Sequence, residues 1–247
     1  IYPNDMSEMF YNCISLTVLN LNYFRTTYLR FMKYMLYNCK SMNRLYISNT
    51  FSNSFVIDMR GVFEKCESLT TLDLANFYTP NVEIMWDMFK GCKNLKNLYI
   101  QNFDTSKVTD MQSMFNGCSN LTTLNLNHFK TPKVQYMNKM FQNCLQLESI
   151  YLSQLTTESL GTMYRMFYNC SKLKYINFFS LDGDVLSFTE MFENTSANFQ
   201  FCIKDESDIP NIFNLLLQKP KVTRDCSNSC YGNNNNNRIY ASTEKKC

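Results

Sequence analysis

Cysteines recur along this chain at a nearly constant interval. Seven of its 11 cysteines are separated by steps of 26, 27, 26, 26, 26 and 26 residues: Cys13, Cys39, Cys66, Cys92, Cys118, Cys144 and Cys170. A period in the twenties is typical of a solenoid, in which each repeat is one supersecondary unit stacked on its neighbours. This ladder constrains the architecture more than any other feature of the sequence.

Each repeat combines two periodicities, and the unit from Phe103 to Phe129 shows both clearly. Its first half places apolar side chains three or four residues apart, which predicts a short helix: Val108, Met111, Met114 and Phe115. Its second half has the Leu-x-x-Leu-x-Leu spacing, and the alternation at its end predicts a short strand: Leu121, Leu124 and Leu126. We therefore expect one helix and one strand per repeat, with the strands in a parallel sheet.

The residues at the ends of the first half agree with a helix. Threonines stand where an N-cap hydroxyl would accept a free backbone N–H: Thr79, Thr105, Thr131 and Thr157. The residue before each cysteine is Asn or Gly, with Lys65 as the exception: Asn12, Asn38, Gly91, Gly117, Asn143 and Asn169. Asn and Gly tolerate the left-handed backbone conformation that closes many helices, so we expect that conformation at these positions.

These residues resemble the BspA-type leucine-rich repeat, a repeat of roughly 25 residues found in bacterial, mollicute and protist surface proteins. The resemblance covers about residues 6–192. It implies an α/β leucine-rich-repeat solenoid at a cell surface or outside the cell, which acts in adhesion or protein contact without catalysis. The family has no fixed functional residues, so the resemblance transfers no site.

The repeats define the expected domain organisation. We expect residues 1–197 to form the solenoid, with seven repeats and a degenerate eighth that carries Phe188, Met191 and Phe192 and has Thr195 in place of the cysteine. Residues 198–247 are expected to form a small C-terminal cap, with a closing strand near 199–203 and a helix over about 208–219. One extra residue around 48–50 is expected to bend the solenoid locally without breaking it.

The chain contains two kinds of cysteine. The seven in the repeats occupy one register and point the same way, which favours buried, reduced thiols over disulfides or metal ligands. The other four make an even set, which in an extracellular protein predicts two disulfides in the cap: Cys202, Cys226, Cys230 and Cys247. Of three possible connectivities we favour Cys202–Cys226 with Cys230–Cys247. A zinc site is the weaker alternative, because the only histidine, His128, lies far upstream.

The outward positions of the predicted strands form an almost uncharged face. Its central column alternates Tyr with Asn or Asp, and its candidate ligand-binding residues are Tyr46, Asp73, Tyr99, Asn125 and Tyr151. Tyrosine offers apolar area together with a polar group, which suits the recognition of a glycan or a peptide. The alternative is that these residue types simply belong to a solvated sheet face.

Three Asn-x-Ser/Thr sequences are candidate glycosylation sites in a secreted eukaryotic protein: Asn120, Asn169 and Asn194. The formal net charge of +3, without a long basic run, argues against nucleic-acid binding. No apolar stretch approaches the length of a membrane span. A single histidine and scattered glycines match no familiar enzyme motif, so we expect no enzyme, no cofactor and no metal.

The sequence therefore predicts a non-catalytic extracellular or cell-surface protein that acts in adhesion or surface assembly. The first repeat shows no capping segment, which suggests self-association end to end into a filament, a contact that propagates when the rotation does not close. The alternative is a receptor-like module that binds glycan or peptide on its Tyr/Asn strand face.

Overall fold

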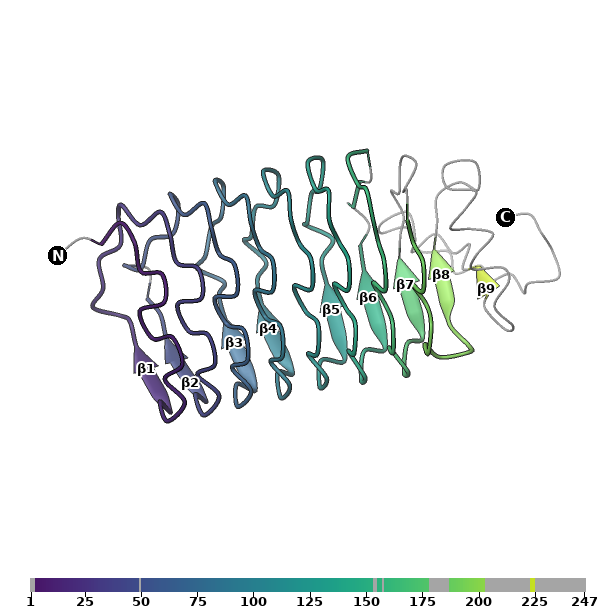
Figure 1. Cartoon of the computed structure of the whole chain (residues 1–247), viewed down its shortest axis with the longest axis horizontal. Helices are drawn as coiled ribbons and strands as arrows, with labels where there is room; N and C mark the ends of the chain where they lie inside the picture. Colours follow the sequence, from purple (N-terminus) through teal and green to yellow (C-terminus); the bar gives the residue numbers. More distant parts are fainter. Residues whose placement is uncertain are drawn as a thin grey trace, which may run out of the picture.

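The computed structural model describes residues 3–48, 50–152, 155–156, 158–177, 187–202 and 223–224. The chain winds in successive turns, here called rungs, and each rung contributes one short strand to a row (Figure 1). The strands are β1 Val18–Asn20, β2 Arg44–Tyr46, β3 Thr71–Asp73, β4 Asn97–Tyr99, β5 Thr123–Asn125, β6 Ser149–Tyr151, β7 Tyr175–Asn177, β8 Gln200–Cys202 and β9 Thr223–Arg224. The predicted parallel strands are confirmed, and β8 lies inside the expected closing strand.

Strand pairing is parallel throughout but is interrupted twice. Strands β1 and β2 pair, β3 and β4 pair, and β5 to β9 form a five-stranded sheet. The break between β2 and β3 coincides with the predicted one-residue insertion, where the hydroxyl of Thr50 donates to the Asn22 carbonyl at 2.8 Å. No insertion accompanies the break between β4 and β5, and we have no physical account of it.

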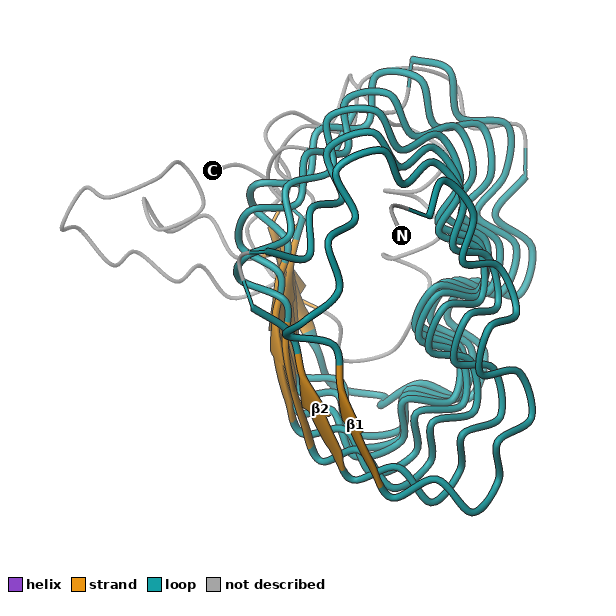
Figure 2. Ribbon diagram, turned by 90° about the vertical axis from the view of Figure 1, so that its left-hand side faces the viewer, coloured by secondary structure: helices purple, strands orange, loops and turns teal. Residues whose placement is uncertain are grey.

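A second ladder runs along the stack, away from the strands. One residue per rung forms an isolated parallel bridge to the next, without a gap at the insertion: Asp5, Phe31, Asp58, Ile84, Asp110, Tyr136, Thr162 and Ser187. In cross-section the strands lie along one side and stacked loops form the rest of the ring (Figure 2). The rungs thus stay joined by main-chain hydrogen bonds where strand pairing is interrupted.

The predicted helices are wrong, because none of the described residues lies in a helix. The first half of each repeat is a chain of turns in which alternate backbone N–H groups bond to the next rung. Thus Met111 donates to the carbonyl of Tyr136, and Ser113 to that of Asn138, while Met114 closes a turn onto Met111. A helix would keep these hydrogen bonds within its own segment, whereas turns share them between stacked rungs. Successive turns bring residues three or four apart to one side, as a helix does.

The left-handed conformation before each cysteine is confirmed. Its φ values lie between +56° and +75°, and Lys65 adopts it as well, with φ of +60°. A second left-handed residue, which the sequence analysis missed, stands four positions earlier in every rung: Glu8, Tyr34, Gly61, Asp87, Ser113, Lys139, Arg165 and Glu190. These residues interrupt any helix that the apolar spacing would otherwise favour.

The expected N-cap threonines have a different role. Thr79, Thr105 and Thr131 are buried, and each hydroxyl donates to a main-chain carbonyl of the next rung at 2.7–2.8 Å. With no helix to cap, these side chains join neighbouring rungs instead. Thr157 lies outside the described residues.

The interior is filled by columns of like residues. Six phenylalanines stack face to face with ring centroids 5.3–5.6 Å apart and planes within 11° of parallel: Phe63, Phe89, Phe115, Phe141, Phe167 and Phe192. Methionines, leucines and valines of the repeat complete the buried core. Rings offset by about one strand spacing gain stacking energy beyond their burial.

The repeat cysteines are free thiols, as predicted, and all but the half-buried Cys13 are buried. From Cys39 onward, each Sγ donates to a main-chain carbonyl of the preceding rung at 3.1–3.3 Å, as Cys118 does to Phe89. Burial raises the pKa of Cys39 to about 11 and that of Cys92 and Cys170 to about 12. The column therefore consists of protonated thiols that join adjacent rungs.

The expected disulfide cap is not seen in the described part of the chain. Cys202 ends β8, while Cys226, Cys230 and Cys247 lie outside the described residues, as does the helix expected over 208–219. The two disulfides, with the pairing favoured above, stay predictions.

Candidate recognition surface

The strand face presents the predicted Tyr/Asn column. Tyr46, Asp73, Tyr99, Asn125 and Tyr151 each occupy the last residue of a strand, in β2 to β6. Tyr46 and Tyr99 are 45% and 48% exposed, while Tyr151 is half-buried beside Tyr175, with ring centroids 5.6 Å apart. In β3 and β5 the middle residue is buried and the two flanking residues are exposed, as expected for strands with one face on the core.

Strand register brings some of these side chains together. Asp73 stands opposite Tyr99 on paired strands, and Asn125 stands opposite Tyr151. Tyr46 is paired with Asn20 instead, because the sheet is interrupted between β2 and β3. The candidate face thus places Tyr46 beside Asn20, Tyr99 beside Asp73, and Tyr151 between Asn125 and Asn177.

The Asn and Asp side chains of this face stabilise the turns that follow their strands. The side-chain oxygen of Asn20, Asp73 and Asn125 accepts the backbone N–H two residues later, at 2.9–3.0 Å. This local turn changes the direction of the chain at the ends of β1, β3 and β5. One oxygen of each is therefore occupied, so the tyrosines are the more available recognition groups of this face.

The three candidate glycosylation sites differ in accessibility. The amide nitrogens of Asn120 and Asn169 donate to Asn94 and Asn143 of the preceding rung, at 3.1 and 2.9 Å. Asn194 is exposed in a left-handed turn. A glycan replaces one of the two hydrogens on Nδ2, so it would have to be fitted beside these bonds at Asn120 and Asn169. Asn194 is therefore the best placed acceptor of the three.

The stacked turn segments from the first half of each repeat, here called the wall of turns, carry a feature that the sequence analysis missed. An open depression of about 370 Å³ is lined by Glu8, Tyr11, Tyr34, Tyr37, Glu64 and Asp87; these six residues are called the tyrosine–carboxylate pocket below. The repeat alignment offered a signal for it. Glu64 stands where the two preceding repeats have Tyr11 and Tyr37, and Asp87 stands at the position of Glu8 and Tyr34.

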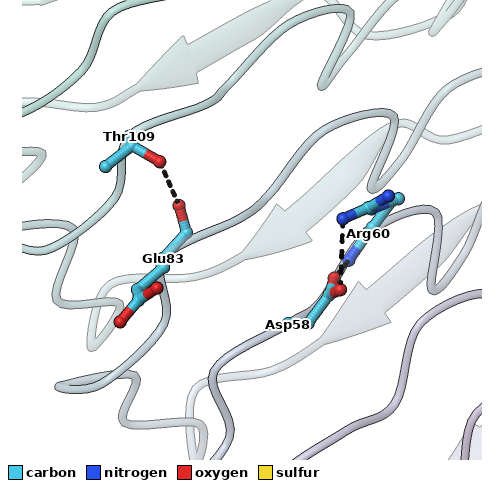
Figure 3. A network of polar contacts seen from close by, with 4 residues as sticks. All are labelled: Asp58, Arg60, Glu83 and Thr109. Carbon is cyan, nitrogen blue, oxygen red and sulfur yellow. Dashed lines mark hydrogen bonds and ion pairs between the residues drawn. The ribbon is translucent and has the colours of Figure 1, made fainter.

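Nearby polar groups on the same wall of turns bond to one another. The hydroxyl of Thr109 donates to the Glu83 carbonyl at 3.1 Å, and the guanidinium of Arg60 pairs with Asp58 at 3.3 Å (Figure 3). Arg60 also lies over the ring of Trp86, 5.5 Å from its centroid.

Among the described residues, no side chains are arranged as a recognisable reaction centre. His128 is half-buried, its Nε2 lies 2.9 Å from the Ile100 carbonyl, and burial lowers its pKa. No cluster of three His, Cys, Asp or Glu suited to a metal ion occurs in the described ranges. No helix long and apolar enough to cross a bilayer was found among the described residues.

Comparison with known proteins identifies the family. Residues 4–99 and 96–205 match the family described as "Mycoplasma protein of unknown function, DUF285". No curated protein is significantly similar to the chain.

Two similar solved structures come from bacteria of the genera Bacteroides and Faecalibacterium. A leucine-rich repeat protein from Bacteroides ovatus ATCC 8483 has 15% identity and a TM-score of 0.38, over 80% of this chain and 57% of that one. A leucine rich cell surface protein from Faecalibacterium prausnitzii A2-165 has 16% identity and a TM-score of 0.30, over 73% and 63%. This chain thus spans less than two thirds of either.

The resemblance to the BspA-type leucine-rich-repeat family is confirmed by the family match. The two matched segments together run from residue 4 to residue 205 of 247. The chain therefore belongs to the DUF285 family.

Proposed function

We propose that this protein is a non-catalytic recognition module of the cell surface or the extracellular space, which acts in adhesion or surface assembly through its strand face. The observation that carries the proposal is the row of outward tyrosines on rigid, stacked strands, with Tyr46 and Tyr99 each about half exposed. A relative of similar repeat type is titled a leucine rich cell surface protein, which supports the location.

The ligand class that best suits this face is a glycan or an extended peptide. A tyrosine ring stacks on the apolar face of either, and its hydroxyl donates one hydrogen bond. Tyrosines on alternate strands recur at about 10 Å, two strand spacings, so a chain-like ligand would contact several in succession.

Glycan and peptide arrays test this proposal. We expect the chain to bind a defined class of probe, and Tyr46→Ser/Tyr99→Ser/Tyr151→Ser to lose that binding with its thermal unfolding retained. A matched control replaces three tyrosines outside the strand column by serine: Tyr23, Tyr78 and Tyr136. Equal binding by both triple variants would refute the strand face as the binding surface.

End-to-end self-association is a second candidate. The first rung exposes apolar side chains, each more than 40% exposed: Met9, Tyr11, Ile14 and Val18. Light scattering and negative-stain imaging at rising concentration decide the matter. Regular fibres that disappear in Met9→Ser/Val18→Ser support assembly, and a monodisperse monomer at high concentration excludes it for this chain.

A further inference from the structure

The tyrosine–carboxylate pocket is built from four successive rungs and has an unusual lining. Glu8 and Tyr11 come from the first rung, Tyr34 and Tyr37 from the second, Glu64 from the third and Asp87 from the fourth. Every lining residue is a tyrosine or a carboxylic acid, and none carries a positive charge. The pocket lies on the wall of turns, apart from the strand tyrosines proposed above as the recognition face.

The three tyrosines form two faces of a cage. The rings of Tyr11 and Tyr37 stack with centroids 4.6 Å apart and planes within 10° of parallel. Tyr34 stands edge-on to Tyr37, at 5.8 Å and 88°. Perpendicular rings expose both a face and an edge to the same space, and aromatic faces attract cations through the ring quadrupole.

Two carboxylates in the pocket are almost completely buried. Glu64 and Asp87 are each only 5% exposed. The ammonium of Lys90 lies 3.2 Å from Glu64 Oε1 and 2.9 Å from Asp87 Oδ2, so one positive charge serves two negative ones. The other oxygen of Asp87, Oδ1, is buried and has no hydrogen bond to any described residue.

The other cationic side chains nearby, Lys65 and Arg60, are not paired with the carboxyl groups of Glu64 or Asp87. Lys65 donates to the Tyr37 hydroxyl at 2.7 Å and lies over the Tyr37 ring, 4.9 Å from its centroid, while Arg60 is paired with Asp58. Burial raises the pKa of both Glu64 and Asp87 despite the opposing effect of Lys90. The Trp86 side chain also lowers the pKa of Asp87, without a hydrogen bond of ordinary geometry to Oδ1. The site therefore holds two buried carboxyl groups for one paired ammonium, beside three tyrosine rings.

We propose that the tyrosine–carboxylate pocket binds the cationic side chain, lysine or arginine, of a basic peptide. The ammonium or guanidinium group would lie against Tyr34, because Tyr11 stacks on the Tyr37 ring and Lys65 lies over it. It would donate to the carboxylate of Asp87, whose Oδ1 has no hydrogen bond of ordinary geometry. Charge-assisted hydrogen bonds to a buried carboxylate are about twice as strong as neutral ones, and a guanidinium can make two at once.

The sole tryptophan provides the readout, because Trp86 directly precedes Asp87. The purified chain is titrated with N-acetyl-lysine methylamide, N-acetyl-arginine methylamide and, as an uncharged match, N-acetyl-norleucine methylamide. We expect a saturable fluorescence change with the two cationic probes and none with norleucine. A norleucine response equal to that of lysine, or no saturable response to either cation, overturns the proposal.

Variants locate the site. Asp87→Asn keeps the shape of the side chain and is expected to weaken binding by about tenfold, the loss of one charge-assisted hydrogen bond. Tyr11→Leu, at an exposed position, is expected to weaken it severalfold. Glu67→Gln is the matched control, because Glu67 lies on the same rung as Glu64 but pairs with Lys93 outside the pocket. Unchanged binding by folded Asp87→Asn refutes the assignment.

Two further arms separate the alternatives. Free n-butylammonium should bind more weakly than the lysine derivative, and equal binding would contradict the assignment to a peptide. The strand-face variant Tyr46→Ser/Tyr99→Ser/Tyr151→Ser should retain the response in full. Failure of the strand-face proposal and failure of the pocket are therefore measured independently.

Discussion

At the scale of single residues, the thiol column makes the clearest prediction. The six buried cysteines from Cys39 to Cys170 donate to carbonyls, and their pKa is raised by burial, so little thiolate forms at mildly alkaline pH. Iodoacetamide at mildly alkaline pH should label Cys13 and spare these six, as read by peptide mapping. Denatured protein is the control, in which all seven repeat cysteines should react. Rapid labelling of Cys118 in folded protein would contradict this burial.

Gly61 supplies a second prediction at this scale. It has φ of +57°, and an added Cβ would lie 2.3 Å from two atoms of the Tyr34 ring. Gly61→Ala should therefore lower the free energy of unfolding by about 1 kcal/mol from the backbone and about 1–3 kcal/mol more from the collision. Urea denaturation measures the change.

Gly117→Ala is the matched control for the collision. Gly117 has φ of +75°, but its added Cβ meets nothing closer than 3.6 Å, so only the backbone cost should appear. The double variant Gly61→Ala/Tyr34→Ala should fall between the two. Equal destabilisation by both single alanine variants would mean that the Tyr34 ring moves aside without cost.

At the scale of elements, the absence of helix from the described rungs has a direct spectroscopic consequence. Alternate N–H groups of the turn segments bond to the next rung and not within a helix. Far-UV circular dichroism should therefore lack the paired minima of an α-helix. A helical signal large enough for one helix per repeat would contradict the described rungs.

The buried threonines test how neighbouring rungs are joined. The hydroxyl of Thr131 donates to the carbonyl of Thr156 at 2.8 Å and accepts its N–H at 2.9 Å. Thr131→Val keeps the volume but leaves both groups unpaired, so it should cost about 1–3 kcal/mol of unfolding free energy. Thr123→Val, at an exposed strand position, should be nearly neutral. Equal midpoints in urea for the two variants would exclude this role for Thr131.

The strands could be predicted from the sequence more completely than the turn segments. Alternation around Leu72 or Leu124 has one explanation, because only a strand places every second residue inside. Spacing of three and four, as in Val108 and Met111, is shared by a helix and by consecutive turns, so periodicity could not separate them. Asn and Gly before the cysteines indicated one left-handed position, but Ser113 and Lys139 at the other gave no such signal.

The candidate sites were predictable to different degrees for a related reason. The tyrosines of the strand face share one register, which a repeat alignment makes visible. The tyrosine–carboxylate pocket depends on four rungs that each depart from the repeat in a different way. Its chemistry arises from the stacking of Glu64 and Asp87 near Tyr34 and Tyr37, which no single repeat displays.

At the scale of the whole molecule, stacking converts a repeated sequence into long columns of like side chains. The inward columns form a continuous core from Met6 to Phe201, and the outward columns form the strand face. Stability of such a stack comes from contacts between neighbouring rungs. A surface of this kind suits an extended ligand, which is the basis of the proposed role in adhesion.

Adhesion of protein-coated beads tests that central claim most directly. Beads that carry the chain, the strand-face triple variant or the control triple variant of Tyr23, Tyr78 and Tyr136 are compared on epithelial cell layers under flow. The account predicts that the chain and the control variant adhere alike, while the strand-face variant falls to the level of albumin-coated beads. Adhesion of the strand-face variant equal to that of the unmodified chain, or no adhesion above albumin by any of the three, would contradict it.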